Sequence, residues 1–169
     1  PISMQIATNS DDRKKLALEA AKQLKDQSGP RVAVFELDGF DTHAAQGGVD
    51  GAHADELEEV NDIVKILYEN LGSAFDNTLI LTLTEFGRTI KQNGGYGTEH
   101  GYGSAILMAG GLLKKSQVYS YWPGLKKKEL FEGRDLNSTI DSRAVYNSAM
   151  SVCFNPVSYT HLRAHETHR

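Results

Sequence analysis

The segment from Leu79 to Ser104, LILTLTEFGRTIKQNGGYGTEHGYGS, decides the fold class that we predict for this chain. It opens with residues 79–84, which are rich in β-branched and large apolar side chains, as is typical of a strand buried on both faces. Charged and imidazole side chains separated by glycines follow at once. This layout is typical of an α/β active site, which lies beyond the carboxyl ends of parallel strands.

Two helices and a further strand precede this segment. Apolar spacing after Ser10 predicts a helix that has Ser10 as its N-cap and ends before Gly29. Residues 31–37 predict a strand that runs into the polar loop 38–43, with the sequence DGFDTH. From Ala52 to Leu71, apolar residues recur at spacings of three and four, which predicts a second amphipathic helix.

This helix–strand–helix–strand order predicts a βαβ unit, whose two strands are parallel and joined by a right-handed crossover. The strands 31–37 and 79–84 would then end at the same edge of the sheet, and their two polar loops should meet. The other predicted elements are a buried strand at 104–109, a short edge strand that begins at 118–119, and a last helix that is capped by Ser138 or Thr139 and has Asp141 in its first turn.

Composition limits the classes of function. The 169 residues are enough for one domain with a core. The formal net charge of −4 argues against a general nucleic-acid binder, because phosphates require a basic surface. The single cysteine cannot form an internal disulfide. No window holds the roughly 18 apolar residues that a membrane-spanning helix needs, so we predict no membrane span.

The segment from Ser158 to Arg169 fits none of these patterns and resembles the translation of a short-read sequencing adapter. His161 and His165 are four residues apart, a spacing that would suit a metal site on a helix. We nevertheless predict a non-native or disordered tail at 158–169, and one domain at 1–157. Because the chain does not begin with Met, we expect it to be a piece of a longer protein.

The two polar loops contain residues that could bind a metal. Asp41 and His43 are separated by one residue at a strand end, so their side chains point the same way and could share one divalent cation. A surface loop with a capping Asp is the alternative. Glu99 and His100 could serve two neighbouring metals, or one could be a ligand that the other supports. Oxygen and nitrogen ligands suit zinc, manganese, magnesium or calcium and do not choose among them.

Glu85 directly follows the predicted buried strand, where an unpaired carboxylate would be costly. We therefore expect it to have a partner, which is either Arg88 in a structural ion pair or a bound cation. Asn93 and Gly94 form a turn signal, and a turn is the role that we predict for them.

Three stretches of the chain, FELDGFDTHAAQGG, DNTLILTLTEFGRTIKQNGGYGTEHGYGSAILMAGG and VYSYWPGLKKKELFEGRDLNSTIDSRAVY, resemble the C-terminal part of the domain of unknown function 1501 family. These are bacterial proteins related to the alkaline phosphatase and sulfatase superfamily. The resemblance covers roughly Asp11 to Asn155. It implies an α/β fold, namely a three-layer α/β/α sandwich with a mainly parallel sheet, of which this chain would hold an incomplete, C-terminal part.

The resemblance also implies a site for one or two divalent metal ions, which would polarise a small anionic phosphate or sulfate ester. Arg88 would bind the anion bidentately. A Ser or Thr nucleophile would lie in the missing N-terminal half, so the fragment alone should be inactive. The implied metal ligands are Asp41, His43, Glu85, Glu99 and His100.

Three positions depart from the family pattern. Glu99 stands where Asp is usual, Asp38 replaces a usual Gly, and Phe40 replaces Trp. Full-length relatives tend to carry an export signal, so we expect the parent protein to be exported, to the periplasm for example. The parent would be a metal-dependent ester hydrolase. The alternative is a secreted binding or assembly module that keeps the fold without catalysis.

Overall fold

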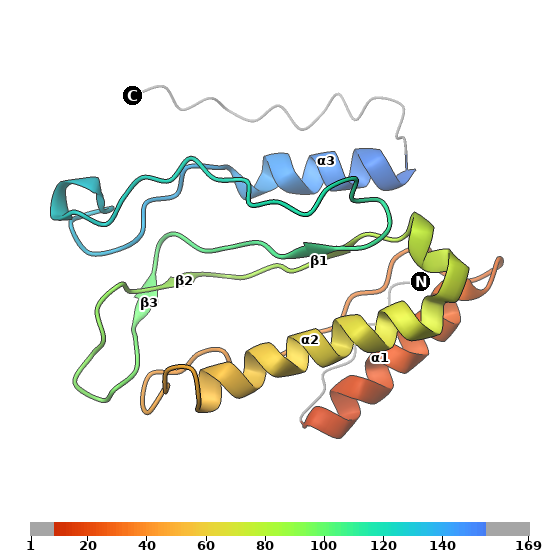
Figure 1. Cartoon of the computed structure of the whole chain (residues 1–169), viewed down its shortest axis with the longest axis horizontal. Helices are drawn as coiled ribbons and strands as arrows, with labels where there is room; N and C mark the ends of the chain where they lie inside the picture. The colour runs from red at the N-terminus through yellow and green to blue at the C-terminus, as the bar shows by residue number, and fades with distance from the viewer. Residues whose placement is uncertain (1–8, 155–169) are drawn as a thin grey trace.

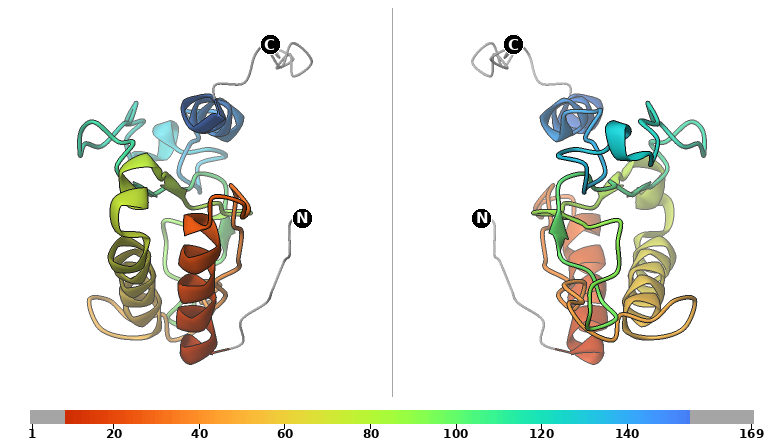
Figure 2. Two further views of the ribbon diagram at one scale, coloured as in Figure 1. Left: turned by 90° about the vertical axis from the view of Figure 1, so that its right-hand side faces the viewer. Right: turned by 90° about the vertical axis from the view of Figure 1, so that its left-hand side faces the viewer.

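The computed structural model describes residues 9–154, and every structural statement below concerns that part of the chain. Helices α1 and α2 lie on one side of a layer of extended segments, and α3 lies on the opposite side (Figures 1 and 2). The helical elements are α1 (Ser10–Lys25), α2 (Ala52–Leu71), the 3-10 helices η1 (Gly72–Asn77) and η2 (Lys127–Glu129), and α3 (Ser142–Phe154). The strands are β1 (Ile80–Leu81), β2 (Gly87–Arg88), β3 (His100–Gly101) and β4 (Met108–Ala109).

Helix α1 is the predicted first helix, with a different cap. The Asn9 side chain accepts a hydrogen bond from the backbone N–H of Asp12 at 2.9 Å, so Asn9 is the N-cap and Ser10 is the first helical residue. The prediction of Ser10 as the cap was wrong by one residue, because the Asn9 side chain reaches the free N–H groups of the first turn. Acidic residues in that turn and lysines in the last turn complement the helix dipole.

Helix α2 has the predicted bounds and packs against α1 to form the buried core. Alanines of α1 allow the larger side chains of α2 to approach closely. Leu57, which the spacing places on the apolar face of α2, is 46% exposed, because the buried positions of α2 begin at Ile63. The buried apolar residues are Ala17, Ala20, Ala21, Ile63, Leu67 and Leu71.

The described strands form two short antiparallel pairs. β1 pairs with β4, and these strands lie within the predicted strands 79–84 and 104–109. β2 pairs with β3. Leu83 is 61% exposed, so the expectation that 79–84 is buried on both faces was wrong within the described residues, where no layer covers that side chain. Residues 118–119 form no strand in this part of the chain. The parallel sheet and the three-layer sandwich stay predictions.

Helix α3 begins later than the sequence suggested. The Asp141 carboxylate accepts a hydrogen bond from the backbone N–H of Arg143 at 2.9 Å, so Asp141, rather than Ser138 or Thr139, satisfies the first turn. No residue of α3 is buried. Between residues 9 and 154, no helix is both long and apolar enough to cross a membrane. The predicted tail at 158–169 lies outside the described residues.

Candidate metal centre

The two polar loops meet because their backbones form hydrogen bonds with each other. Residues 42–46, at the end of the first loop and just beyond it, run beside residues 93–98 of the glycine-rich segment. The absence of a side chain at Gly97 makes this possible, since a Cβ there would lie 2.3 Å from the carbonyl carbon of His43. The joining hydrogen bonds run from Ala45 N to Gly95 O (2.8 Å), from Gln46 N to Tyr96 O (2.9 Å) and from Thr98 N to Thr42 O (3.1 Å).

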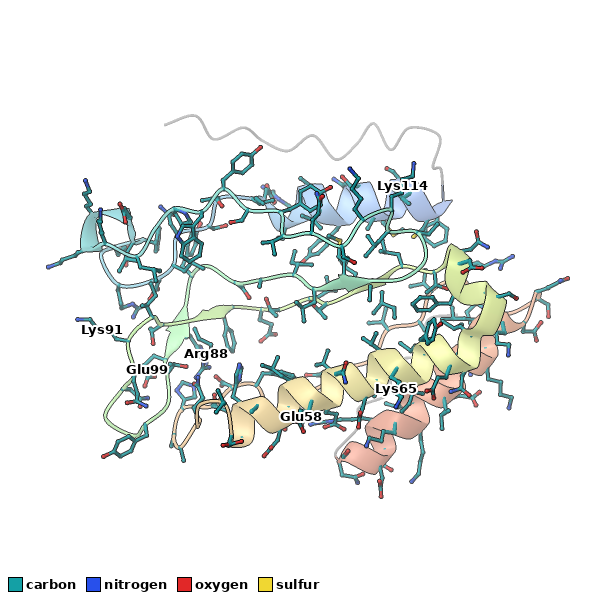
Figure 3. All side chains as sticks on the ribbon, viewed as in Figure 1. Glu58, Lys65, Arg88, Lys91, Glu99 and Lys114 are labelled. Carbon is teal, nitrogen blue, oxygen red and sulfur yellow. The ribbon has the colours of Figure 1, made fainter. Side chains whose placement is uncertain are left out.

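The β2–β3 pair places two further side chains at this junction. Arg88 lies directly opposite His100 in the antiparallel register, and opposite residues point to the same face of a sheet. Phe86 stacks on the His100 ring, with the ring centroids 3.8 Å apart and the planes inclined by 16°. The end of the molecule that carries Arg88 and Glu99 is seen in Figure 3.

Asp41, His43 and His100 bring three potential ligand atoms together. Asp41 Oδ1 is 3.0 Å from His43 Nε2 and 3.1 Å from His100 Nε2, and the two Nε2 atoms are 3.2 Å apart. Ligands at 2.0–2.1 Å from a tetrahedral zinc ion lie about 3.3 Å from one another. The three side chains therefore fit one face of a tetrahedral metal site.

This triangle of ligand atoms is open to solvent. The side chains of Asp41, His43 and His100 are 49%, 42% and 51% exposed. A cation can therefore approach these side chains from solvent. The same exposure means that water also has access to them.

Arg88 forms an ion pair with the Asp41 carboxylate. Its Nη1 donates to Asp41 Oδ1, its Nη2 donates to the carbonyl of Thr98, and its Nε donates to Thr98 Oγ1 at 2.9 Å. Thr98 Oγ1 donates in turn to Gln46 Oε1 at 2.7 Å. Partial desolvation opposes ionisation of Asp41, but the hydrogen bonds from His100 and Arg88 outweigh it and hold the pKa of this carboxyl below its usual range.

Glu99 lies on the other edge of the His43 ring. Its Oε2 is 3.0 Å from His43 Nδ1, whereas Asp41 and His100 face Nε2. Asn93 Nδ2 donates to Glu99 Oε1 at 2.6 Å, and this hydrogen bond is the main reason why the pKa of Glu99 is lowered. The structure thus brings Glu99 to the cluster but not to the triangle of ligand atoms.

Glu85 stands apart from the cluster of Asp41, His43 and His100 that the structure forms within residues 9–154. It is exposed, and the ion pair with Arg88 that we considered is absent from this part of the chain, because Arg88 pairs with Asp41 instead. An exposed carboxylate at this position is solvated, so the expected need for a partner does not arise.

Sequence reasoning missed two residues that build the site. Thr98 is buried and links Arg88 to Gln46, and no motif pointed to it. Asn93 does form the predicted turn, since its Oδ1 accepts hydrogen bonds from the backbone of Gly95 and Gly97, but it also contacts Glu99. Its position six residues before Glu99 in a glycine-rich loop carried no signal of that contact.

Comparison with known proteins gives a family and no characterised relative. The family model described as "Protein of unknown function (DUF1501)" matches residues 8–155. No protein with curated annotation and no solved structure matches the chain.

Proposed function

The chain belongs to the DUF1501 family of proteins of unknown function, and we propose that Asp41, His43 and His100 bind one divalent metal ion in it. We further propose that the intact protein is an exported, metal-dependent hydrolase of phosphate or sulfate esters. The observation that carries the metal site is the triangle of ligand atoms with edges of 3.0 to 3.2 Å.

The chemistry of the donors favours zinc among the four metals considered. Two imidazole nitrogens and one carboxylate oxygen make up the set, and imidazole is a better ligand for zinc than for magnesium or calcium. Three protein ligands are also usual for a catalytic zinc ion, which keeps a position open for water or substrate. A structural zinc ion would instead have four protein ligands.

The hydrolase proposal assigns roles to this chain's own residues. When bound, the metal would polarise an oxygen of the ester and stabilise charge on the leaving oxygen. Arg88 is held beside Asp41, where its guanidinium would bind the oxyanion of the substrate. We place the nucleophile outside this chain. Helices α1 and α2 on one side of the extended layer, with α3 on the other, support the proposed α/β/α sandwich.

The exposure of the site favours a second candidate function. Enzymes that act on charged esters strengthen their electrostatic contacts by excluding water. Asp41, His43 and His100 are each exposed by 42% or more in this structure. A secreted binding or assembly module that holds a metal ion without catalysis would require no such exclusion.

The first test measures metal binding. Calorimetry and thermal unfolding of the chain with zinc should show one bound ion, and at one hundred times the dissociation constant zinc should stabilise the fold by about 2.7 kcal/mol. His43→Ala and His100→Ala should lose this stabilisation. Glu58→Ala, which removes an exposed carboxylate on α2 away from the site (Figure 3), is the control. Equal stabilisation in all four proteins would remove the proposed site.

The second test separates the two candidate functions. The full-length parent protein is assayed against p-nitrophenyl phosphate and p-nitrophenyl sulfate, with zinc and with manganese. Hydrolysis that is lost in His43→Ala and His100→Ala supports the hydrolase. Metal binding without hydrolysis of either ester supports the binding module.

A further inference from the structure

We propose that Glu99 and Asn93 are positioning residues of the metal centre: Glu99 holds the His43 ring so that Nε2 faces Asp41 and His100, and Asn93 holds Glu99. This inference rests on the proposed metal site and gives Glu99 a different role from the ligand role that the family resemblance implies. It also gives a function to an asparagine that the sequence assigned to a turn alone.

The contact between Glu99 and His43 bears on which ring nitrogen of His43 carries the hydrogen. An ionised carboxylate can only accept, so the contact of 3.0 Å between Glu99 Oε2 and His43 Nδ1 favours a hydrogen on Nδ1. Asp41 Oδ1 faces Nε2 of the same ring at 3.0 Å, so without a metal the two carboxylates compete for the one hydrogen of a neutral ring. A metal ion held by Asp41, His43 and His100 would take the Nε2 lone pair and leave the hydrogen on Nδ1, where Glu99 accepts it. Glu99 therefore favours the form of His43 that a metal ligand needs.

The same geometry keeps Glu99 away from the metal position. Glu99 and His100 are consecutive residues, and they approach His43 from opposite edges of its ring. His100 reaches the Nε2 edge, and Glu99 reaches the Nδ1 edge. A carboxylate that accepts from the second nitrogen of a ligating histidine is a common outer partner in metal sites, and its loss typically weakens metal binding about 10- to 100-fold.

Asn93 links Glu99 to the glycine-rich loop by hydrogen bonds. Its Nδ2 donates to Glu99 Oε1 at 2.6 Å and to the carbonyl of His43 at 2.8 Å. Its Oδ1 accepts from the backbone of Gly95 and Gly97 at 2.9 and 3.0 Å. One side chain thus fixes the turn, the backbone of a ligand residue and the carboxylate that orients that ligand.

The first experiment measures the tautomer of His43 without metal. In ¹⁵N-labelled chain at pH 8, histidine side-chain spectra should show a sizeable fraction of the Nδ1–H form of His43, because Glu99 competes with Asp41 for the ring hydrogen. Glu99→Ala should move His43 to predominantly Nε2–H, the form that free neutral imidazole side chains prefer. Glu58→Ala should change nothing. An unchanged His43 tautomer in Glu99→Ala would overturn the proposal, whether or not the chain binds a metal.

Asn93→Asp tests the second residue of the pair. The substitution keeps an acceptor for the Gly95 and Gly97 amides, so the turn should survive, but it replaces the donor to Glu99 with a like charge. We expect the His43 spectrum to shift in the same direction as in Glu99→Ala. An unchanged spectrum would remove Asn93 from the proposal.

The second experiment uses cobalt(II) as a visible probe of the ligand set. Glu99→Ala should bind cobalt about 10- to 100-fold more weakly than the wild-type chain, with the same absorption bands at saturation. A changed spectrum at saturation would make Glu99 a ligand and overturn its positioning role. If the wild-type chain binds no cobalt and no zinc, the metal centre itself fails, and the tautomer experiment still decides whether Glu99 orients His43.

Discussion

Two arginines hold the two ends of the same loop in different environments. Arg13 of α1 binds Asp38, where the loop begins, and Arg88 of β2 binds Asp41 near its end. The Arg13 side chain is 7% exposed and also binds Glu56 and Glu59 of α2. The Arg88 side chain is 18% exposed, but its partner Asp41 is 49% exposed.

The buried ion pairs of Arg13 therefore serve the stability of the fold, whereas the half-exposed Asp41 beside Arg88 is accessible to a metal ion. Burial alone would lower the pKa of Arg13, but the hydrogen bonds that Arg13 donates to Asp38, Glu56 and Glu59 outweigh it and raise the pKa above its usual value. This cluster is costly to break, because the carboxylates of Glu56 and Glu59, which are 23% and 11% exposed, would be left without their cation. The Arg88 side chain is mostly covered, but its partner Asp41 is half exposed, so the Asp41 carboxylate can also face a cation from solvent.

The largest expected effect comes from the buried arginine. Arg13→Met keeps most of the side-chain volume but leaves Glu56 and Glu59 without their cation, so the free energy of unfolding should fall by about 3 to 5 kcal/mol. Urea denaturation followed by circular dichroism measures it. Lys14→Met is the matched control, since the ion pair of Lys14 with Asp62 is exposed and its loss should not be measurable. Equal effects of the two substitutions would contradict the contrast between the regions.

A smaller effect is expected where the two loops meet. Gly97→Ala places a Cβ against the carbonyl carbon of His43, and relief of such overpacking typically costs about 1 to 3 kcal/mol. Because the displaced segment carries a proposed ligand, zinc binding measured by calorimetry should weaken at least about tenfold. Gly94→Ala lies in the same loop, meets no atom within 4 Å and should leave both quantities unchanged. Normal zinc binding in Gly97→Ala would show that the loop contact does not position His43.

The smallest effect is expected from the hydroxyl behind Arg88. Thr98→Val keeps the shape of the buried side chain but removes the acceptor for Arg88 Nε and the donor to Gln46, which should cost about 1 to 2 kcal/mol in unfolding experiments. Thr139→Val, at an exposed position, is the control. If both variants unfold at the same urea concentration, the link between Arg88 and Gln46 contributes nothing to stability.

Local patterns predicted the helices better than the strands. The spacing of apolar residues from Ala52 to Leu71 gave the bounds of α2 directly, because an amphipathic helix needs only its own periodicity and one packing partner. The strands β1 and β4 cover only two residues of each of the runs 79–84 and 104–109, and Leu107 in the second run is 52% exposed rather than buried. Residues 31–37, which were predicted to be a strand, are not among the strands of the described residues. The antiparallel pairing of β1 with β4 was not foreseen, because a strand's partner depends on residues distant in the sequence.

The candidate site, too, was predicted only in part. The family resemblance implied one set of ligands, Asp41, His43, Glu85, Glu99 and His100. The structure brings together all of them except Glu85. The sequence could not show that His100 is a proposed ligand and Glu99 a positioning residue. The two residues are adjacent, and their roles differ only because they reach opposite edges of the His43 ring. The edge that each reaches is set by the β2–β3 register and by the hydrogen bonds of Asn93.

The sequence by itself determined which chemical groups the two loops carry and that α1 and α2 form, because composition and helical periodicity are properties of short stretches. Only the tertiary structure decided that Arg88 pairs with Asp41 rather than with Glu85, and that three ligand atoms converge to within 3.2 Å of one another. The physical reason is steric. The loops approach through glycines whose missing side chains leave room for a distant backbone, and no local pattern specifies which backbone fills that space.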